Sequence, residues 1–314
     1  MRAFLRRRLP SGLLVLVLAS FLVFLILRLI PGDPASSLAG PDAGPAAVEA
    51  VRARLGLDQP LPAQYLHWLG GLLTGDLGPS YAIGGQVADL IGEGLGNTVE
   101  LTIGALVLVV GIGLPLGVAG AVTKRRPVAA LVRAVTTAVL AVPPFVTGIL
   151  LVLVFAVTLG LLPAGGHESI LDEPDIGLQY LLLPAVCLAL PSAAILARYL
   201  KDSLEQALGE DYVRTATALG ISRRRIVWRH ALPNALPAAL TVLGLQIGQL
   251  LGGAVLVEAI FAWPGLGQLA EQGVTRRDYP VVQDLLLLLV AAYVAVQLLT
   301  DLVHTWLDPR VRWE

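Results

Sequence analysis

Cysteine is almost absent from this 314-residue chain, and charged residues are few. Cys187 is the single cysteine, which excludes an intrachain disulfide and a metal site built from several cysteines. Asp, Glu, Lys and Arg make up 14% of the residues, against roughly 25% in a typical soluble domain. So few charges cannot cover a water-facing surface, and the 56% hydrophobic content instead favours a bundle of membrane helices.

Nucleotide-binding and catalytic motifs are also missing from the sequence. A Walker A loop needs a Gly-Lys pair before Ser or Thr, and neither Lys124 nor Lys201 follows a glycine. The four histidines have no spacing that pairs them for metal binding or catalysis. A proton-coupled carrier would hold ionisable groups near the membrane midplane, whereas the acids here fall at the ends of the apolar runs. We therefore expect a non-catalytic chain with no cofactor of its own, rather than an enzyme or a self-powered transporter.

Long charge-free runs are abundant. About 20 apolar residues cross a membrane core of ~30 Å, and six runs of that order predict an all-α polytopic protein with six transmembrane helices. We expect the first span, within residues 1–30, to be retained, because its apolar run exceeds the 7–15 residues usual in a cleaved signal peptide. The other spans are expected at about 99–123, 132–160, 177–199, 233–258 and 282–306.

The placement of the 22 Lys and Arg residues predicts the orientation. Most of them lie in the first residues, in two alternate loops and at the end of the chain, so the positive-inside rule places both termini in the cytoplasm. This order leaves residues 31–97 as a large extracytoplasmic segment, 98–308 as the membrane core and 307–314 as a cytoplasmic tail.

The extracytoplasmic segment contains apolar residues at helical spacing, among them Tyr65, Trp68 and Leu72. This spacing is typical of a helix that lies at the membrane interface. Two interpretations stay open: a packed lid over the bundle, or a docking surface for another protein.

The cytoplasmic loop of residues 200–232 has a pattern of two short helices. Gly220 predicts a left-handed stop for the first helix, and Ser222 an N-cap for the second, which is strongly basic. The arginines suit an amphipathic helix on anionic headgroups, and they equally suit a docking element for a cytoplasmic partner.

The same loop carries a recognisable motif. Arg214-Thr215-Ala216 is followed after three residues by Gly220 and, nine residues later, by His230-Ala231-Leu232-Pro233. Its spacing, its glycine and its Leu-Pro pair resemble the signature of permease subunits in binding-protein-dependent ATP-binding-cassette importers, although the usual leading Glu and the Ile are replaced. Further segments resemble the dipeptide/oligopeptide/nickel branch of that family: Pro31-Gly32-Asp33-Pro34, Leu55 to Pro62, Gly75 to Gly78, Glu258 to Gly267, Asp278-Tyr279-Pro280 and Leu307 to Arg312.

This resemblance implies a role for the loop and a set of partners. The loop would be the coupling helix seated on an ATPase subunit, through Tyr212, Val213, Arg214, Thr215, Ala216, Leu219 and Gly220, with Leu232 and Pro233 at its exit. The implied partners are a second homologous permease, two ATPases or one two-headed ATPase, and an extracytoplasmic binding protein. ATP and Mg would sit on the ATPases, membrane lipid would surround the chain, and no nucleic acid is expected. The implied cargo is a di- or oligopeptide; nickel or another small solute is the alternative, and a stand-alone channel or carrier is a remote one.

The fifth span combines small and polar residues. Gly244, Gly248 and Gly252 form a small-residue ridge that would let another helix approach closely. Gln246 and Gln249 fall about 60° apart at 100° per residue, away from that ridge. They would face a polar translocation path or, alternatively, bond to a neighbouring helix.

Overall fold

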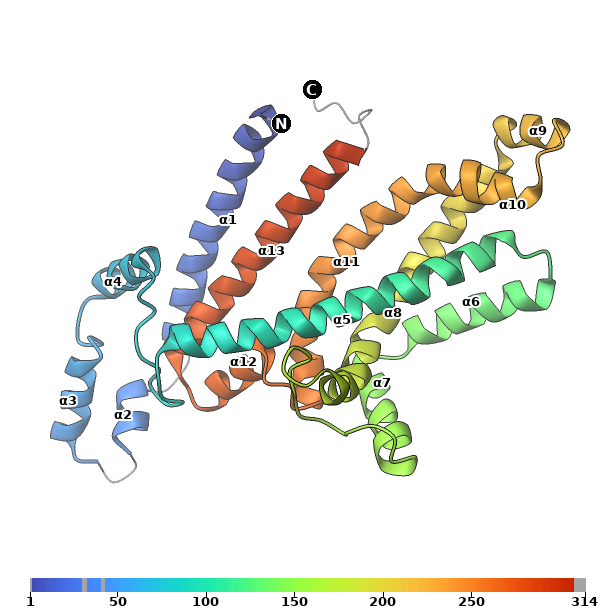
Figure 1. The fold of residues 1–314 in the computed structure, drawn as a ribbon. Coiled ribbons are helices and arrows are strands. Elements are labelled where there is room, and N and C mark those ends of the chain that lie inside the picture. Colours follow the sequence, from blue (N-terminus) through green and yellow to red (C-terminus); the bar gives the residue numbers. More distant parts are fainter. Residues whose placement is uncertain (1, 30–32, 41–42, 308–314) are drawn as a thin grey trace. The chain divides into compact units, whose positions relative to one another are not determined.

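The computed structural model describes residues 2–29, 33–40 and 43–307 (Figure 1). Within these ranges every regular element is a helix, apart from an isolated bridge between Pro79 and Gln86. Pro31-Gly32 and the tail beyond Leu307 lie outside the described residues. The chain divides into two compact units, residues 1–97 with 264–295, and residues 98–263 with 296–314.

The described residues form five helices that are long and apolar enough to cross a membrane, and a bent helix pair makes six if it counts as one span. The predicted all-helical membrane protein is thus confirmed. The five long stretches are Pro10–Leu29, Val87–Val122, Pro174–Gly209, Arg223–Ile260 and Tyr279–Leu299.

The bent pair lies where a single third span was expected. Helix α6 (Arg126–Ala141) is followed by α7 (Pro144–Leu151) and a π-helical segment (Val152–Thr158), with a bend of 103° between the two halves. Val142 and Pro143 are both extended, because each precedes a proline and that position disfavours the helical conformation. Two consecutive prolines therefore break the helix here, whereas helix α8 (Pro174–Gly209) runs through Pro184 and Pro191 without interruption.

The second unit is built around α8. It packs along α11 (Leu232–Ile260), and the core between them includes Leu188, Leu250 and Val257. Helix α5 (Val87–Val122) approaches α8 through glycines: a Cβ at Gly117 would lie 2.9 Å from the Ala197 carbonyl oxygen. Close packing of α5 on α8 therefore depends on residues without side chains.

In the first unit, helix α4 (Leu61–Thr74) packs against α1 (Arg2–Leu29). Tyr65 of α4 contacts Phe24 edge to face, with ring centroids 5.4 Å apart, and its hydroxyl lies 2.9 Å from that of Ser20. Part of the segment predicted as lid or docking surface is thus packed on a membrane helix. The remaining helices of this unit are α2 (Pro34–Ala39), α3 (Pro45–Arg54), the first part of α5, α12 (Leu266–Thr275) and the first part of α13 (Tyr279–Leu307).

Candidate functional site

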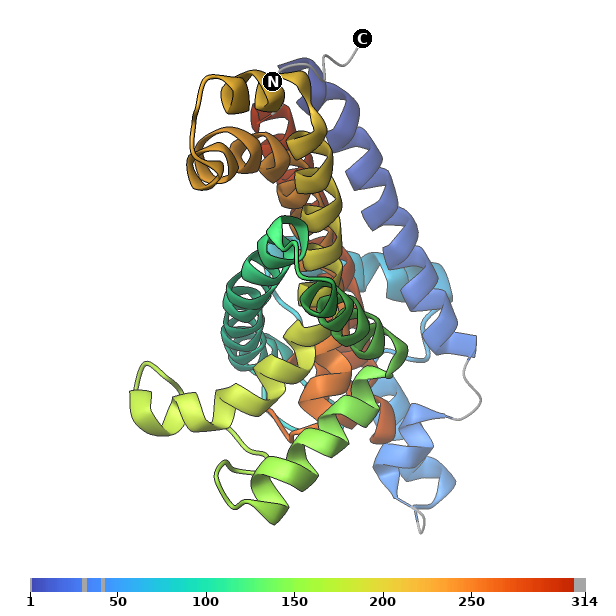
Figure 2. The same cartoon turned by 90° about the vertical axis from the view of Figure 1, so that its right-hand side faces the viewer.

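The loop that carries the importer motif lies at one end of the α8–α11 pair, where Figures 1 and 2 both show α9 and α10 in gold. The sequence pattern predicted two short helices from about residue 198, but α8 continues to Gly209, and α9 spans Asp211–Ala218. The break falls at Glu210, whose backbone is extended. Leu204, within the predicted loop, therefore belongs to α8, where its side chain is buried.

Gly220 ends α9 in the way the sequence predicted. Its φ is +77°, a left-handed conformation that strains any residue with a Cβ. The Ile221 amide donates to the Ala216 carbonyl and the Gly220 amide to the Thr217 carbonyl, which is the Schellman pattern. A Cβ at Gly220 would meet no atom of this chain within 4 Å. The backbone conformation, and not lack of space within the chain, requires glycine here.

The tip of this loop presents apolar and charged groups outwards. Leu219 is 75% exposed and Tyr212 is 38% exposed, whereas Ala216 is buried against the loop itself. Arg214 pairs with Asp211 at 3.1 Å, with both side chains exposed. An exposed leucine beside a rigid turn is a surface suited to contact with another protein.

The second half of the loop leads into α11 without a break. Ser222 occupies the predicted N-cap position of α10 (Arg223–Ile226), but its side chain makes no capping hydrogen bond. A π-helical segment, Val227–Ala231, then joins α11, which begins at Leu232 with Pro233 in its first turn. The predicted exit residues of the loop are thus the first residues of a long helix.

The residues suggested for the translocation path differ in their surroundings. Gln246 is buried, at 7% exposure, whereas Gln249 is exposed on α11. A Cβ at Gly252 would meet no atom within 4 Å, whereas a Cβ at the neighbouring Gly253 would lie 3.1 Å from a methyl carbon of Leu188. The two glutamines do not share one environment within the chain, and their role in transport stays a prediction, as does packing through Gly244, Gly248 and Gly252.

A polar cluster that sequence reasoning did not assign lies in the second unit. The Glu258 side chain is fully buried at the end of α11, and its Oε1 accepts a 2.6 Å hydrogen bond from the Thr98 hydroxyl. Nearby, Glu100 lies 3.3 Å from the His167 ring nitrogen, and that ring meets the buried Trp263 edge to face. These contacts connect α5, at Thr98 and Glu100, to the loop before α8 and to the end of α11. The only sequence signal was that these acids fall at span ends.

A second unassigned cluster centres on Asp278 in the first unit. Its carboxylate accepts hydrogen bonds from the Ser80 hydroxyl and from the backbone amides of Tyr81, Ala82 and Ile83. Burial raises the pKa of Asp278, but these four hydrogen bonds outweigh it and hold the pKa below its ordinary value. One ionised carboxylate thus fixes the whole turn of residues 80–83.

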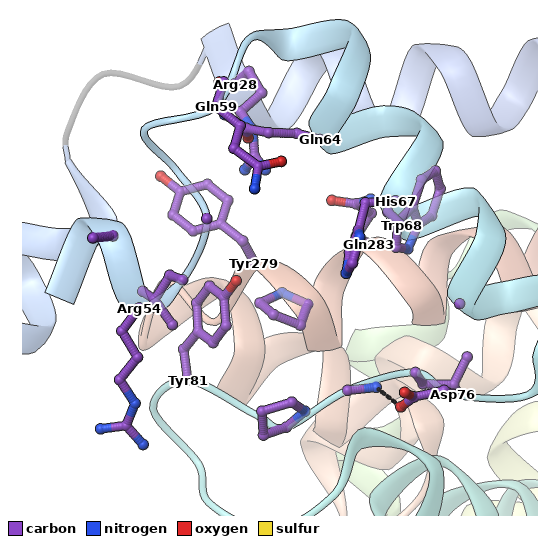
Figure 3. Close-up of a pocket in the computed structure, with 18 residues that line it drawn as sticks. Arg28, Arg54, Gln59, Gln64, His67, Trp68, Asp76, Tyr81, Tyr279 and Gln283 are labelled. Atoms are coloured by element: carbon purple, nitrogen blue, oxygen red, sulfur yellow. Dashed lines mark hydrogen bonds between the residues drawn. The ribbon is translucent and has the colours of Figure 1, made fainter.

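Beside this turn is a cavity of about 450 Å³ (Figure 3). It lies between the end of α1, helix α4 and the start of α13, and all its lining residues belong to the first unit. Its walls include the rings of Trp68, Tyr81 and Tyr279 and the guanidinium of Arg28.

Solved structures share this fold. The MetNI methionine ABC transporter in an inward-facing conformation matches with a TM-score of 0.59 and 22% identity, over 70% of this chain and 96% of that one. An amino acid ABC transporter solved with histidines matches with a TM-score of 0.54 and 19% identity. At these identities the likeness establishes the fold.

Sequence relatives are closer. A probable peptide ABC transporter permease of Sinorhizobium fredii is 38% identical over 313 residues, with both chains covered in full. The glutathione transport system permease GsiC of Escherichia coli O6:H1 is 39% identical over 308 residues, 98% of each chain. Residues 113–313 match the family described as binding-protein-dependent transport system inner membrane component, and residues 1–102 match its N-terminal counterpart. The chain belongs to this family, and it is a multi-pass permease subunit of an ATP-binding-cassette importer in the bacterial inner membrane.

Proposed function

We propose that this chain forms one half of a translocation pathway for short peptides, which an extracytoplasmic binding protein delivers. Relatives that cover its full length carry the names of peptide and glutathione permeases, and glutathione is itself a tripeptide. Nickel or another small solute is the alternative cargo, because the sequence resembles the nickel permeases through most of the same motifs.

Membership in the family implies partnership with an ATPase and a binding protein. We place both termini in the cytoplasm, with residues 31–97 outside, on the distribution of Lys and Arg. A second homologous permease would complete the pathway, and two ATPase subunits, or one with two heads, would hold ATP and Mg. This chain then performs no chemistry; it moves between two states whose populations the ATPases shift.

The observation that carries this proposal is the rigid, outward-facing turn at Gly220. An element that transmits movement must hold its shape, and the Schellman pattern fixes the backbone from Thr215 to Ile221. The exposed Leu219 supplies an apolar contact for an ATPase surface. The alternative in which the basic helix rests on anionic headgroups concerns Arg223 to Arg225 and is compatible with docking through Leu219.

Substitution of Gly220 tests the coupling role. We expect Gly220→Leu to reduce co-purification of the ATPases and peptide uptake at least about tenfold, because the left-handed turn is strained and the docking surface altered. Gly209→Leu is the matched control: a Cβ there also meets nothing within 4 Å, but its φ is not left-handed. If Gly220→Leu keeps both ATPase binding and uptake at normal membrane levels, the loop is not the coupling element.

A further inference from the structure

The cavity beside the Asp278 turn holds polar groups without partners. The described residues contain three buried side-chain atoms with no hydrogen-bond partner: Arg28 Nε, Gln64 Oε1 and Asp284 Oδ2. Two of these residues, Arg28 and Gln64, line this cavity. A buried donor or acceptor left unsatisfied destabilises the folded chain, so a shift of the side chain that lets a ligand satisfy it is favourable.

Among the described residues, no acid forms an ion pair with Arg28. Asp33 pairs with Arg52 at 2.6 Å, and Asp76, which lines the cavity, accepts a hydrogen bond from the Gly78 amide. Asp284 accepts a 2.6 Å hydrogen bond from the Trp68 indole on Oδ1, while its Oδ2 has no partner. Asp278 is saturated by the turn of residues 80–83, as described above. The Arg28 guanidinium instead lies over the Phe24 ring, 4.9 Å from its centroid. An anion is the complement that this corner of the cavity lacks.

The remaining walls suit the body of a short peptide. The rings of Tyr81 and Tyr279 offer apolar faces, and the Gln59, Gln64 and Gln283 amides can exchange hydrogen bonds with peptide groups (Figure 3). Burial raises the pKa of the Tyr81 phenol, while the nearby Arg28 charge opposes that effect, so the phenol is neutral at physiological pH. The volume of about 450 Å³ falls within the roughly 300–1,000 Å³ range of small-molecule sites.

We propose that this cavity is a binding site for the free carboxylate of a short peptide, with Arg28 as the carboxylate-binding group and the tyrosines and glutamines around the peptide body. A guanidinium binds a carboxylate through two parallel hydrogen bonds, and one of its usual donors, Nε, is the atom left unpaired. The inference rests on the proposed peptide cargo and adds to it an entry site, in the first unit, for the charged end of the molecule.

Direct binding tests this site without any transport step. Calorimetric titration of the full chain in detergent would compare alanyl-phenylalanine with its C-terminal amide, which lacks the negative charge. We expect the free acid to bind at least about tenfold more tightly, because a hydrogen bond to a charged group contributes about 1.5–3 kcal/mol. Arg28→Gln should bring the ratio of the two affinities, free acid to amide, close to one, and Arg28→Lys should leave an intermediate ratio. Arg276→Gln is the matched control, because Arg276 is an exposed arginine of the same unit that does not line the cavity.

Several outcomes would overturn the site. Equal affinity for acid and amide, no saturable binding of the acid, or a ratio that survives Arg28→Gln would each do so. If Arg28→Gln instead abolishes only the association with the binding protein, the occupant is a carboxylate of that partner and not a peptide. If the complete importer does not take up peptides, the proposed function is wrong. If it takes up peptides normally but the chain binds the free acid and the amide equally tightly, only the proposed site is wrong.

Discussion

Asp278 illustrates how one side chain can organise a segment far away in the sequence. Its carboxylate is fully buried and collects one hydroxyl and three backbone amides from residues 80–83. Ionisation favours this arrangement, because a protonated carboxyl would lose one acceptor position to its own proton. Asp278 is the first residue of the Asp-Tyr-Pro motif by which the sequence resembles the family, and its structural role is to hold the turn of residues 80–83.

The lowered pKa of Asp278 sets the pH at which this turn loosens. A carboxylate whose pKa is depressed in the folded state contributes stability that is fully present above its ordinary value of 3.8. That contribution is lost as the pH falls through the lower folded value. We expect the protection factors for amide exchange at Tyr81, Ala82 and Ile83 to stay high from neutral pH down to about 4 and to fall below it.

The variant Asp278→Asn should quicken the same amides at neutral pH, because the charge-assisted hydrogen bonds are worth about 1.5–3 kcal/mol each. Asp58→Asn, at an exposed aspartate of the same unit, is the control and should leave them unchanged. Slow exchange in Asp278→Asn at pH 7 would show that the turn holds without the charge.

Helix packing could be predicted only in part from the sequence. Charge-free runs predicted the long helices, whereas the expected third span at 132–160 is divided by the bend at Pro143-Pro144. The sequence predicts a glycine ridge on α11. In the structure, the glycines that lie close to another helix of the unit include Gly113 and Gly117 of α5, which approach α8. The spacing of glycines in the sequence identifies a small-residue ridge, but the helix that packs against the ridge depends on the tertiary structure. The same limit applies to Glu258 and Asp278, whose partners lie more than a hundred residues away.

Leucine substitutions on the two helices distinguish internal packing from subunit packing. Gly117→Leu should lower the thermal midpoint of the purified chain, because its side chain would overlap α8 and overpacking costs about 1–3 kcal/mol. Gly252→Leu should leave that midpoint unchanged, since Gly252 faces open space in this chain. If Gly252 packs a second permease, Gly252→Leu will instead block assembly of the heteromeric complex. An equal loss of midpoint in both variants would contradict the assignment of the packing face to α5.

For the whole molecule, the sequence has no Walker A motif, and family membership implies that an ATPase partner supplies energy. The chain reconstituted alone in vesicles should therefore neither hydrolyse ATP nor accumulate peptide. Both activities should appear when the second permease, the ATPases and the binding protein are added. Peptide accumulation by the isolated chain would identify it as a carrier, and inactive vesicles with correctly inserted chain would support the importer.

The unbroken run from α10 through the π-helical segment into α11 has a mechanical consequence. Residues Arg223–Ile260 form 38 residues of continuous helix, roughly 57 Å at about 1.5 Å per residue. Because no loop interrupts this run, a movement applied beside Gly220 would be carried along α11 towards the buried Glu258 near its other end.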